Sequence, residues 1–211
     1  MLARGDLSHA QLRQVLDTQR QRGNGRIGQW IQKLGYAHEQ QVTAALALQW
    51  SCPLLKVLPE RAAECAVPLH LLKHFRMVPV HFARTSRILH LAFGGDIEYP
   101  ALHAIEQMLG CKTEACLTIS AALDAWLAQM DQETNPTDKV FNGKRGPEEM
   151  ARITSSYALK LHADQVRTVV CGEFIWVRIE GSQDSANLLF LRKQTEVNSS
   201  SQKEILGRAA G

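Results

Sequence analysis

The sequence predicts an α+β protein with three consecutive parts: a helical tandem-repeat subdomain, a small α/β sandwich, and a small unit of one helix with antiparallel strands. A pattern repeats within residues 1–50, and short apolar runs alternate with helical periodicity over 51–130. A polar segment with glycine and proline then precedes another helix and strand set. We expect a first domain over 1–130, a linker over 131–147, a small α+β domain over 148–194 and a disordered tail over 195–211.

The repeat places one set of residue types twice, thirty positions apart. The first copy has Gly5, Leu12, Leu16 and Gln19, and the second has Gly35, Val42, Leu46 and Gln49. The spacing of three and four puts the apolar members of each copy on one helix face. A repeat of this length indicates two stacked modules that bury a shared face.

The first repeat helix has a strong predicted start. Ser8 can accept a hydrogen bond from the amide of Gln11, whose side chain reaches back, while Leu7 can pack onto Leu12. The second copy has His38 and Ala37 at the matching places, which predicts a weaker start.

A short helical turn is expected over 26–31, before the break at Gly35. The position thirty residues before Arg26 would precede Met1, so we expect the first module to lack this turn.

Strands and helices alternate in the middle of the chain. The runs 77–82 and 88–93 predict two strands joined by a tight turn. A break at Gly94-Gly95-Asp96, a helix that stops at Gly110, a strand through Cys116 and a helix over 120–130 follow. The last part predicts a helix from Pro147 and strands over 166–171, 174–179 and 188–191, the first two joined at Gly172-Glu173.

The composition fits a folded globular chain, since 45% of its 211 residues are hydrophobic and its formal net charge is +3. Such a charge is too small to indicate nucleic acid by itself. No apolar run approaches the ~18 residues that cross a bilayer, so we expect no direct membrane insertion. Five cysteines without framework spacing, and no signal-peptide pattern, predict reduced thiols in the cytoplasm.

Catalytic and metal sites are not indicated. The chain lacks the Gly-x-x-x-x-Gly-Lys-Ser/Thr loop that ATP hydrolysis needs, and the segment 142–146 is interpreted as part of the linker. His70 and His74 have metal-ligand spacing but no carboxylate between them, and Cys111 and Cys116 stand too far apart for a paired zinc motif. We therefore expect no enzyme activity, no catalytic residue and no metal.

The block Arg26-Ile27-Gly28-x-x-Ile31-x-x-x-Gly35, followed by Val42, Ala45-Leu46 and Gln49, resembles a tandem motif of one protein family. This family region is the amino-terminal part of the type II secretion and type IV pilus assembly ATPases, the GspE, PilB and MshE group, also called MshEN. The resemblance covers roughly residues 1–130. It implies a module that docks on secretion or pilus assembly proteins, with a location at the inner membrane through such a partner.

The same resemblance implies a possible ligand, cyclic di-GMP. Arg26, Ile27 and Gly28 would be its direct contacts, because a guanidinium can stack on a purine and pair with phosphate while glycine lets the backbone approach. The other motif residues would shape the fold: Gly5, Leu12, Leu16, Gln19, Gly35, Val42, Leu46 and Gln49. The first copy lacks its Arg-Leu-Gly, and the second has Ile27 in place of leucine.

The last part of the chain faintly resembles the second small domain of the same ATPases, through Ala163-Asp164 and the run 177–181. The leading hypothesis is a non-enzymatic regulatory or adaptor module that acts by protein binding. One alternative is a cyclic di-GMP receptor. Another is a helical nucleic-acid reader that uses Arg13, Arg20, Arg22 and Arg26, and nucleic acid is the least expected partner.

Overall fold

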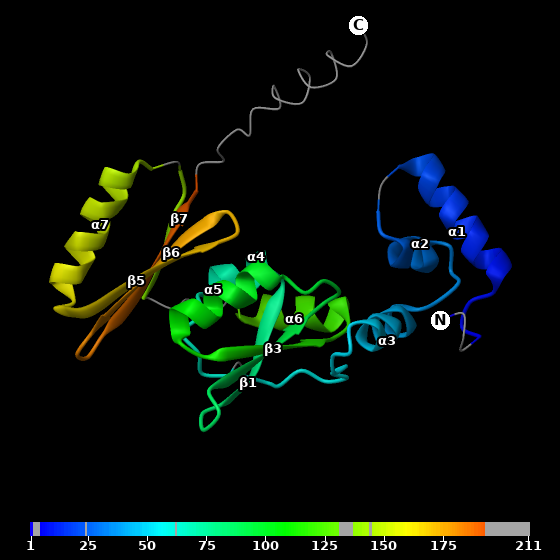
Figure 1. Cartoon of the computed structure of the whole chain (residues 1–211), viewed down its shortest axis with the longest axis horizontal. Helices are drawn as coiled ribbons and strands as arrows, with labels where there is room; N and C mark the ends of the chain where they lie inside the picture. Colours follow the sequence, from blue (N-terminus) through cyan, green and yellow to red (C-terminus); the bar gives the residue numbers. More distant parts are fainter. Residues whose placement is uncertain (2–4, 24, 62, 131–136, 144, 193–211) are drawn as a thin grey trace, which may run out of the picture. The chain divides into compact units, whose positions relative to one another are not determined.

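The computed structural model describes residue 1 and residues 5–23, 25–61, 63–130, 137–143 and 145–192. The chain divides into two compact units, Met1–Asp138 and Lys139–Gly211, and each is described by itself. Helices and strands occur in both, so the expected α+β class is confirmed (Figure 1). The tail expected over 195–211 lies outside the described residues.

Three helices open the first unit: α1 (His9–Arg22), α2 (Ile27–Lys33) and α3 (Glu39–Gln49). The two repeat copies have the same local conformation at the starts of α1 and α3. Gly5 and Gly35 have φ of +74° and +71°, and Ser8 and His38 precede their helices with φ, ψ of −82°, 158° and −79°, 160°. The backbone N–H of Ser8 donates to Oε1 of Gln11 over 2.8 Å, and His38 repeats this bond to Gln41 over 2.9 Å. The repeat is thus one structural pattern used twice.

Apolar side chains from all three helices form one core. Its buried members are Leu7, Val15, Trp30, Ile31, Ala37 and Val42, and Leu12 and Leu46 pack against them. Ser8 Oγ accepts from the amide of Gln11 over 3.2 Å, as the capping pattern predicts. This core fixes how α2 meets α3, and their contact forms the site described below.

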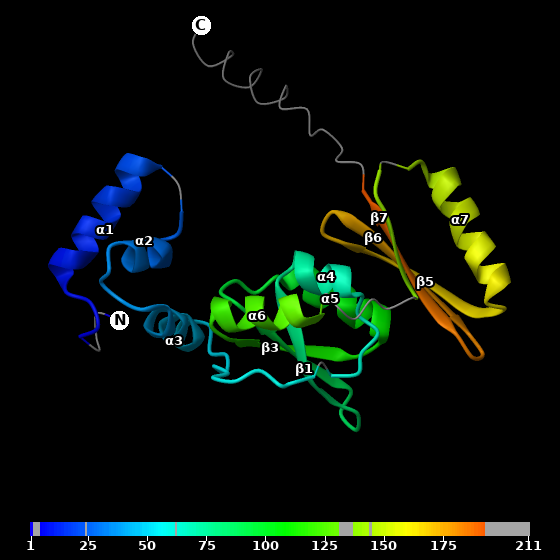
Figure 2. The ribbon, with the colours of Figure 1, turned by 180° about the vertical axis from the view of Figure 1, so that it is seen from behind.

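The rest of the first unit comprises α4 (Leu69–His74), β1 (Met77–Ala83), β2 (Ile88–Phe93), α5 (Tyr99–Leu109), β3 (Lys112–Leu117) and α6 (Ser120–Met130). The sheet order is β1-β2-β3, with β1 antiparallel and β3 parallel to β2. Helices α4, α5 and α6 lie on one side of this sheet in both views (Figures 1 and 2). The parallel pair needs a crossover connection, and α5 supplies it before ending at Gly110 with φ of +58°.

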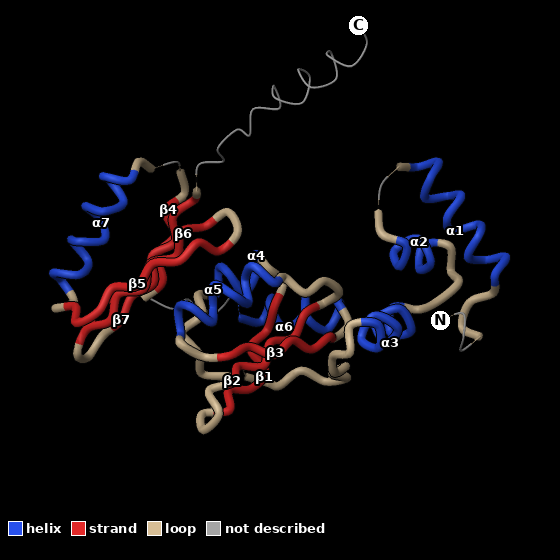
Figure 3. The backbone as a smooth tube through the Cα atoms, viewed as in Figure 1, coloured by secondary structure: helices blue, strands red, loops and turns tan. Residues whose placement is uncertain are grey.

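The second sheet has the order β4-β7-β6-β5, built from β4 (Asp138–Phe141), β5 (Ala163–Cys171), β6 (Phe174–Gly181) and β7 (Ser185–Leu191). Helix α7 (Pro147–Lys160) lies along one face of it (Figure 3). The contact residues are Val177, Ile179, Leu188 and Phe190 from the sheet and Met150, Ile153 and Tyr157 from the helix.

Strand β4 lies inside the segment 131–147 that the sequence analysis interprets as a linker. Strand β4 has only four residues and lies in a polar segment, so the sequence shows no alternation of apolar and polar residues that would predict it. The ring of Phe141 stacks on that of Phe190, with centroids 4.8 Å apart and an interplanar angle of 11°. This contact with a residue far along the chain explains why residues 138–141 join the sheet.

Candidate functional site

A groove lies between α2 and α3 and contains about 1020 Å³ of space that opens to solvent. The described residues that line it carry no charged side chain, and they are Met1, Ile27, Gly28, Ile31, Val42, Ala45, Leu46, Leu48 and Gln49. Two of its apolar residues are exposed, Ile27 by 40% and Leu48 by 67%. Most residues of the second copy of the sequence motif therefore line one cavity, while Arg26 and Gly35 are not among its lining residues.

The first copy of the motif has another place in the structure. Leu12 packs against the helical core, and the groove lining includes none of Gly5, Leu12, Leu16 and Gln19. Nε2 of Gln19 donates to the carbonyl oxygen of Gly25 over 2.8 Å. That bond holds the chain just before Arg26, so Gln19 positions the residue that opens α2.

Gly28 is where α2 and α3 approach each other closely. A Cβ atom at this position would stand 2.9 Å from Cγ1 of Val42, nearer than such atoms pack. Gly28 also lines the groove. Its lack of a side chain thus serves the packing of the two helices, whether or not a ligand approaches it.

Arg26 precedes the first residue of α2, and its guanidinium forms an ion pair with Asp96. Asp96 lies in the Gly94-Gly95-Asp96 turn that follows β2. The two side chains are 63% and 42% exposed, so an anion in solution could reach Arg26. The sequence analysis recognised this turn only as a chain break, because nothing local links it to a residue seventy positions earlier.

A second contact between the helical part and the α/β part lies close to this turn. Oε1 of Glu39, the first residue of α3, accepts a hydrogen bond of 2.5 Å from the backbone N–H of Ser120. A carboxylate at the first turn of α6 also interacts favourably with the helix dipole. Oγ of Ser120 donates to the carbonyl oxygen of Gly94 over 2.7 Å, which ties both contacts to one turn.

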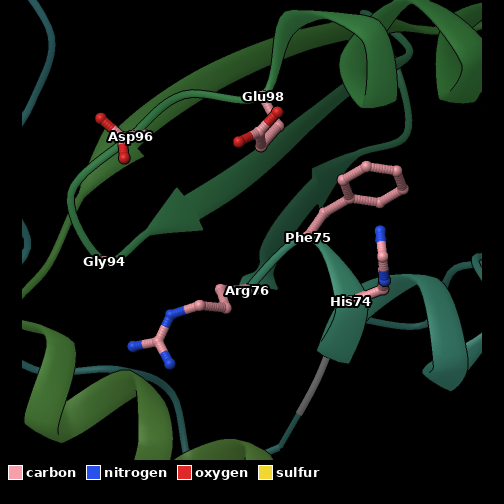
Figure 4. Close-up of a pocket in the computed structure, with 6 residues that line it drawn as sticks. All are labelled: His74, Phe75, Arg76, Gly94, Asp96 and Glu98. Carbon is pink, nitrogen blue, oxygen red and sulfur yellow. The ribbon is translucent and has the colours of Figure 1, made fainter. Parts of the chain in front are cut away.

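The turn also borders a smaller pocket, with about 360 Å³ of empty space, shown in Figure 4. The carboxylates of Asp96 and Glu98 lie on the loop after β2, His74 is the last residue of α4, and Phe75 and Arg76 lie between α4 and β1. The Arg76 guanidinium is engaged by α6, since its Nη1 lies 2.7 Å from Oδ1 of Asp124. The described residues that line this pocket carry charges of both signs and include no serine, threonine or cysteine.

The cysteines have thiols that resist ionisation. Burial raises the pKa of Cys116 and of Cys171 to about 12, and it also raises the pKa of Cys52, Cys65 and Cys111. All five are free thiols. A thiolate is the reactive form of cysteine, and the raised pKa keeps these five thiols neutral at physiological pH, whether the residue is buried (Cys111, Cys116, Cys171) or partly exposed (Cys52, Cys65).

The other features weighed in the sequence are the His70–His74 pair, a membrane-spanning run and the segment 142–146. His70 and His74 share helix α4, and the described residues hold no group of three His, Cys, Asp or Glu side chains suited to a metal ion. Within the same described part, no helix combines the length and apolarity needed to cross a membrane. In the segment 142–146, Arg145 pairs with Glu149 and lies over the ring of Phe141 at 5.3 Å.

Three of the four arginines considered for nucleic acid, Arg20, Arg22 and Arg26, have a partner within the structure. Arg20 has a carboxylate partner in Asp17 at 3.8 Å, and Arg22 lies over the ring of Trp30 at 5.8 Å. Arg26 pairs with Asp96.

No protein-family model matches the chain, and no curated protein matches it significantly. A solved structure of MshE with cdg (cyclic di-GMP) is similar at 22% identity, covering 61% of this chain and 93% of that one, with a TM-score of 0.51. Two structures of the N-terminal domain of XpsE match at 20% identity, covering 61% and 60% of this chain and 88% of theirs, with TM-scores of 0.47 and 0.40. The part of this chain that the MshE match covers therefore has the fold of the MshE structure, which is the fold that the motif resemblance implied.

Proposed function

We propose that this protein is a non-enzymatic binding module of the secretion and pilus assembly type, and that it acts by holding a helix of a partner protein in the α2–α3 groove. The observation that carries the proposal is the lining of the groove, where the described residues carry no charged side chain and Ile27 and Leu48 are exposed. Solvent-exposed apolar surface of this kind is typical of binding sites.

The lining residues suit a helical partner. Ile27 and Ile31 are four apart on α2, and Val42, Leu46 and Gln49 are spaced by four and three on α3. Rows at this spacing form ridges, and the space between two such ridges accepts the apolar face of a third helix. A partner with apolar residues at i, i+3, i+4 and i+7 fits this arrangement.

The test is quantitative capture of secretion and pilus assembly components from cell extract by three forms of the chain. Leu48→Glu places a charge in the groove, and Val57→Glu places the same charge at another exposed apolar residue, outside the groove lining. We expect the native chain and Val57→Glu to retain such a component and Leu48→Glu to lose it. Equal capture by all three, or capture of no such component, would overturn the proposal.

A second candidate function is cyclic di-GMP binding. It is favoured by the position of Ile27 and Gly28 in the groove lining with Arg26 directly before them, and by the similar fold of a structure that holds this dinucleotide. Calorimetry with cyclic di-GMP on the native chain and on Arg26→Ala tests it. Binding that the substitution leaves unchanged would exclude Arg26 as a contact, and absence of binding to the native chain would exclude the function for this chain.

A further inference from the structure

The second sheet ends in an exposed strand that has the properties of a pairing edge. Strand β5 is the last strand in the order β4-β7-β6-β5, and within the part of the chain that the structure describes it pairs only with β6. Two large apolar side chains of β5 are exposed, Val166 by 45% and Val170 by 54%. Between Gln165 and Val170 the strand has no proline or lysine, residues that commonly protect a sheet edge from pairing, and its register shift lies outside this stretch, between Ala163 and Gln165.

The register of β5 shows which backbone groups point outward. Cys171 and Phe174 flank the two-residue turn of the β5–β6 hairpin, so they form a hydrogen-bonded pair. Bonded residues alternate along an antiparallel ladder, so Val169 and Arg167 also bond to β6. The N–H and C=O groups of Val166, Thr168 and Val170 are consequently directed toward the open edge.

The same three residues share one side-chain face. Val166 and Thr168 lie opposite Ile179 and Val177, whose side chains pack against α7. Directly opposed residues lie on the same face of a sheet. The open edge therefore combines outward backbone groups with two exposed valines. Val166 lies two residues before Thr168, and Val170 lies two residues after it.

We propose that β5 is a dimerisation edge, which pairs antiparallel with β5 of a second copy of this chain about a two-fold axis at Thr168. In this register Val166 of each copy lies opposite Val170 of the other, and both exposed apolar pairs become cross-strand contacts. All three outward residues then bond to outward residues of the second copy. The inference concerns the second unit alone and does not rest on the function proposed for the groove.

A competing register with its axis at Arg167 fits less well. A two-fold axis at Arg167 would set two Arg167 side chains directly opposite each other, and like charges in this position are destabilising. It would also place Val170 opposite Asp164. The register at Thr168 sets Arg167 opposite Val169, so it avoids the repulsion and keeps the valines paired.

Two double variants of the full chain test both the dimer and its register. Val166→Lys with Val170→Lys places like charges opposite each other, while Val166→Lys with Val170→Glu places a lysine opposite a glutamate in the proposed register. Both change the same two exposed positions, and circular dichroism with thermal unfolding checks that both fold. Sedimentation equilibrium across a concentration series then measures the dimer dissociation constant of each.

We expect the native chain to dimerise, the Lys/Lys variant to dissociate at least about tenfold more readily, and the Lys/Glu variant to stay within about threefold of the native chain. A mixture of the Lys/Lys variant with a Glu/Glu variant should regain dimers. A native chain that is monomeric at ~100 μM, a Lys/Lys variant that dimerises like the native chain, or two double variants that behave alike would each overturn the proposal. So would a native monomer whose β5 edge pairs only with a strand of another protein.

Discussion

Gly28→Ala should change the stability of the helical part in a direction set by one methyl group of Val42. The new Cβ would lie 2.9 Å from Cγ1 of Val42, and the valine cannot turn away cheaply because β-branched side chains are stiff in helices. Overpacking of this kind costs about 1–3 kcal/mol. Alanine in a helix regains up to about 1 kcal/mol relative to glycine. The net expectation is a destabilisation of roughly 1 kcal/mol, from the difference of these two effects.

The sign should reverse when the methyl group is removed. In a Val42→Ala background no Cγ1 remains, so the clash disappears and only the helix preference is left. Gly28→Ala should then stabilise the protein by up to about 1 kcal/mol, although Val42→Ala by itself is destabilising because Val42 is buried.

The assay is urea unfolding of the native chain, both single variants and the double variant, followed by circular dichroism. Amide hydrogen exchange in α2 and α3 assigns the change to the helical part. An equal effect of Gly28→Ala in both backgrounds would refute the argument that this glycine is required for helix packing.

Three further predictions follow from single contacts. If cyclic di-GMP binds beside Arg26, Asp96→Asn should tighten its binding by up to about fivefold in calorimetry. The ligand would no longer have to displace Asp96 from Arg26, and an exposed ion pair of this kind contributes at most about 1 kcal/mol. Weaker binding by the variant would contradict this. Ser8→Ala should lower the stability of the α1 region by about 1 kcal/mol in hydrogen exchange while Ser8→Asp, which keeps a capping oxygen, should not; equal losses would argue against the cap. Burial raises the pKa of Cys116 and Cys171 to about 12 in the folded protein, whereas the same thiols ionise near pH 9 in the unfolded chain. The free energy of unfolding should therefore keep its full value below pH 9 and fall between pH 9 and 12. Urea midpoints that stay constant over that range would refute this prediction.

Local patterns predicted much of the fold. The strand runs 77–82 and 88–93 match β1 and β2 to within one residue, and the helix expected before Gly110 ends there. Such features depend on side chains within a few residues of each other and on the backbone freedom of one glycine. Helix α4 and strand β4 were missed, since the first is only six residues long and the second is held by contacts with β7.

The candidate site was predicted only in part. The motif resemblance implied Ile27 and Gly28 as ligand contacts and Val42 and Leu46 as fold-shaping residues, and the structure places all four in the lining of one groove. The ion-pair partner of Arg26 was not found, because a carboxylate after a strand has no sequence signal that points to a particular distant arginine. The packing role of Gly28 was also missed, since it depends on how closely two helices approach.

The sequence by itself determined the repeat, its capped helix starts and the alternation of strands and helices, because these follow from interactions between near neighbours along the chain. Only the tertiary structure decided that one motif copy lines a groove while the other supports it, that Asp96 meets Arg26, and that β5 is left at an edge. These arrangements depend on which distant segments pack together. That choice is made by burial of the whole apolar surface and not by any single stretch of residues.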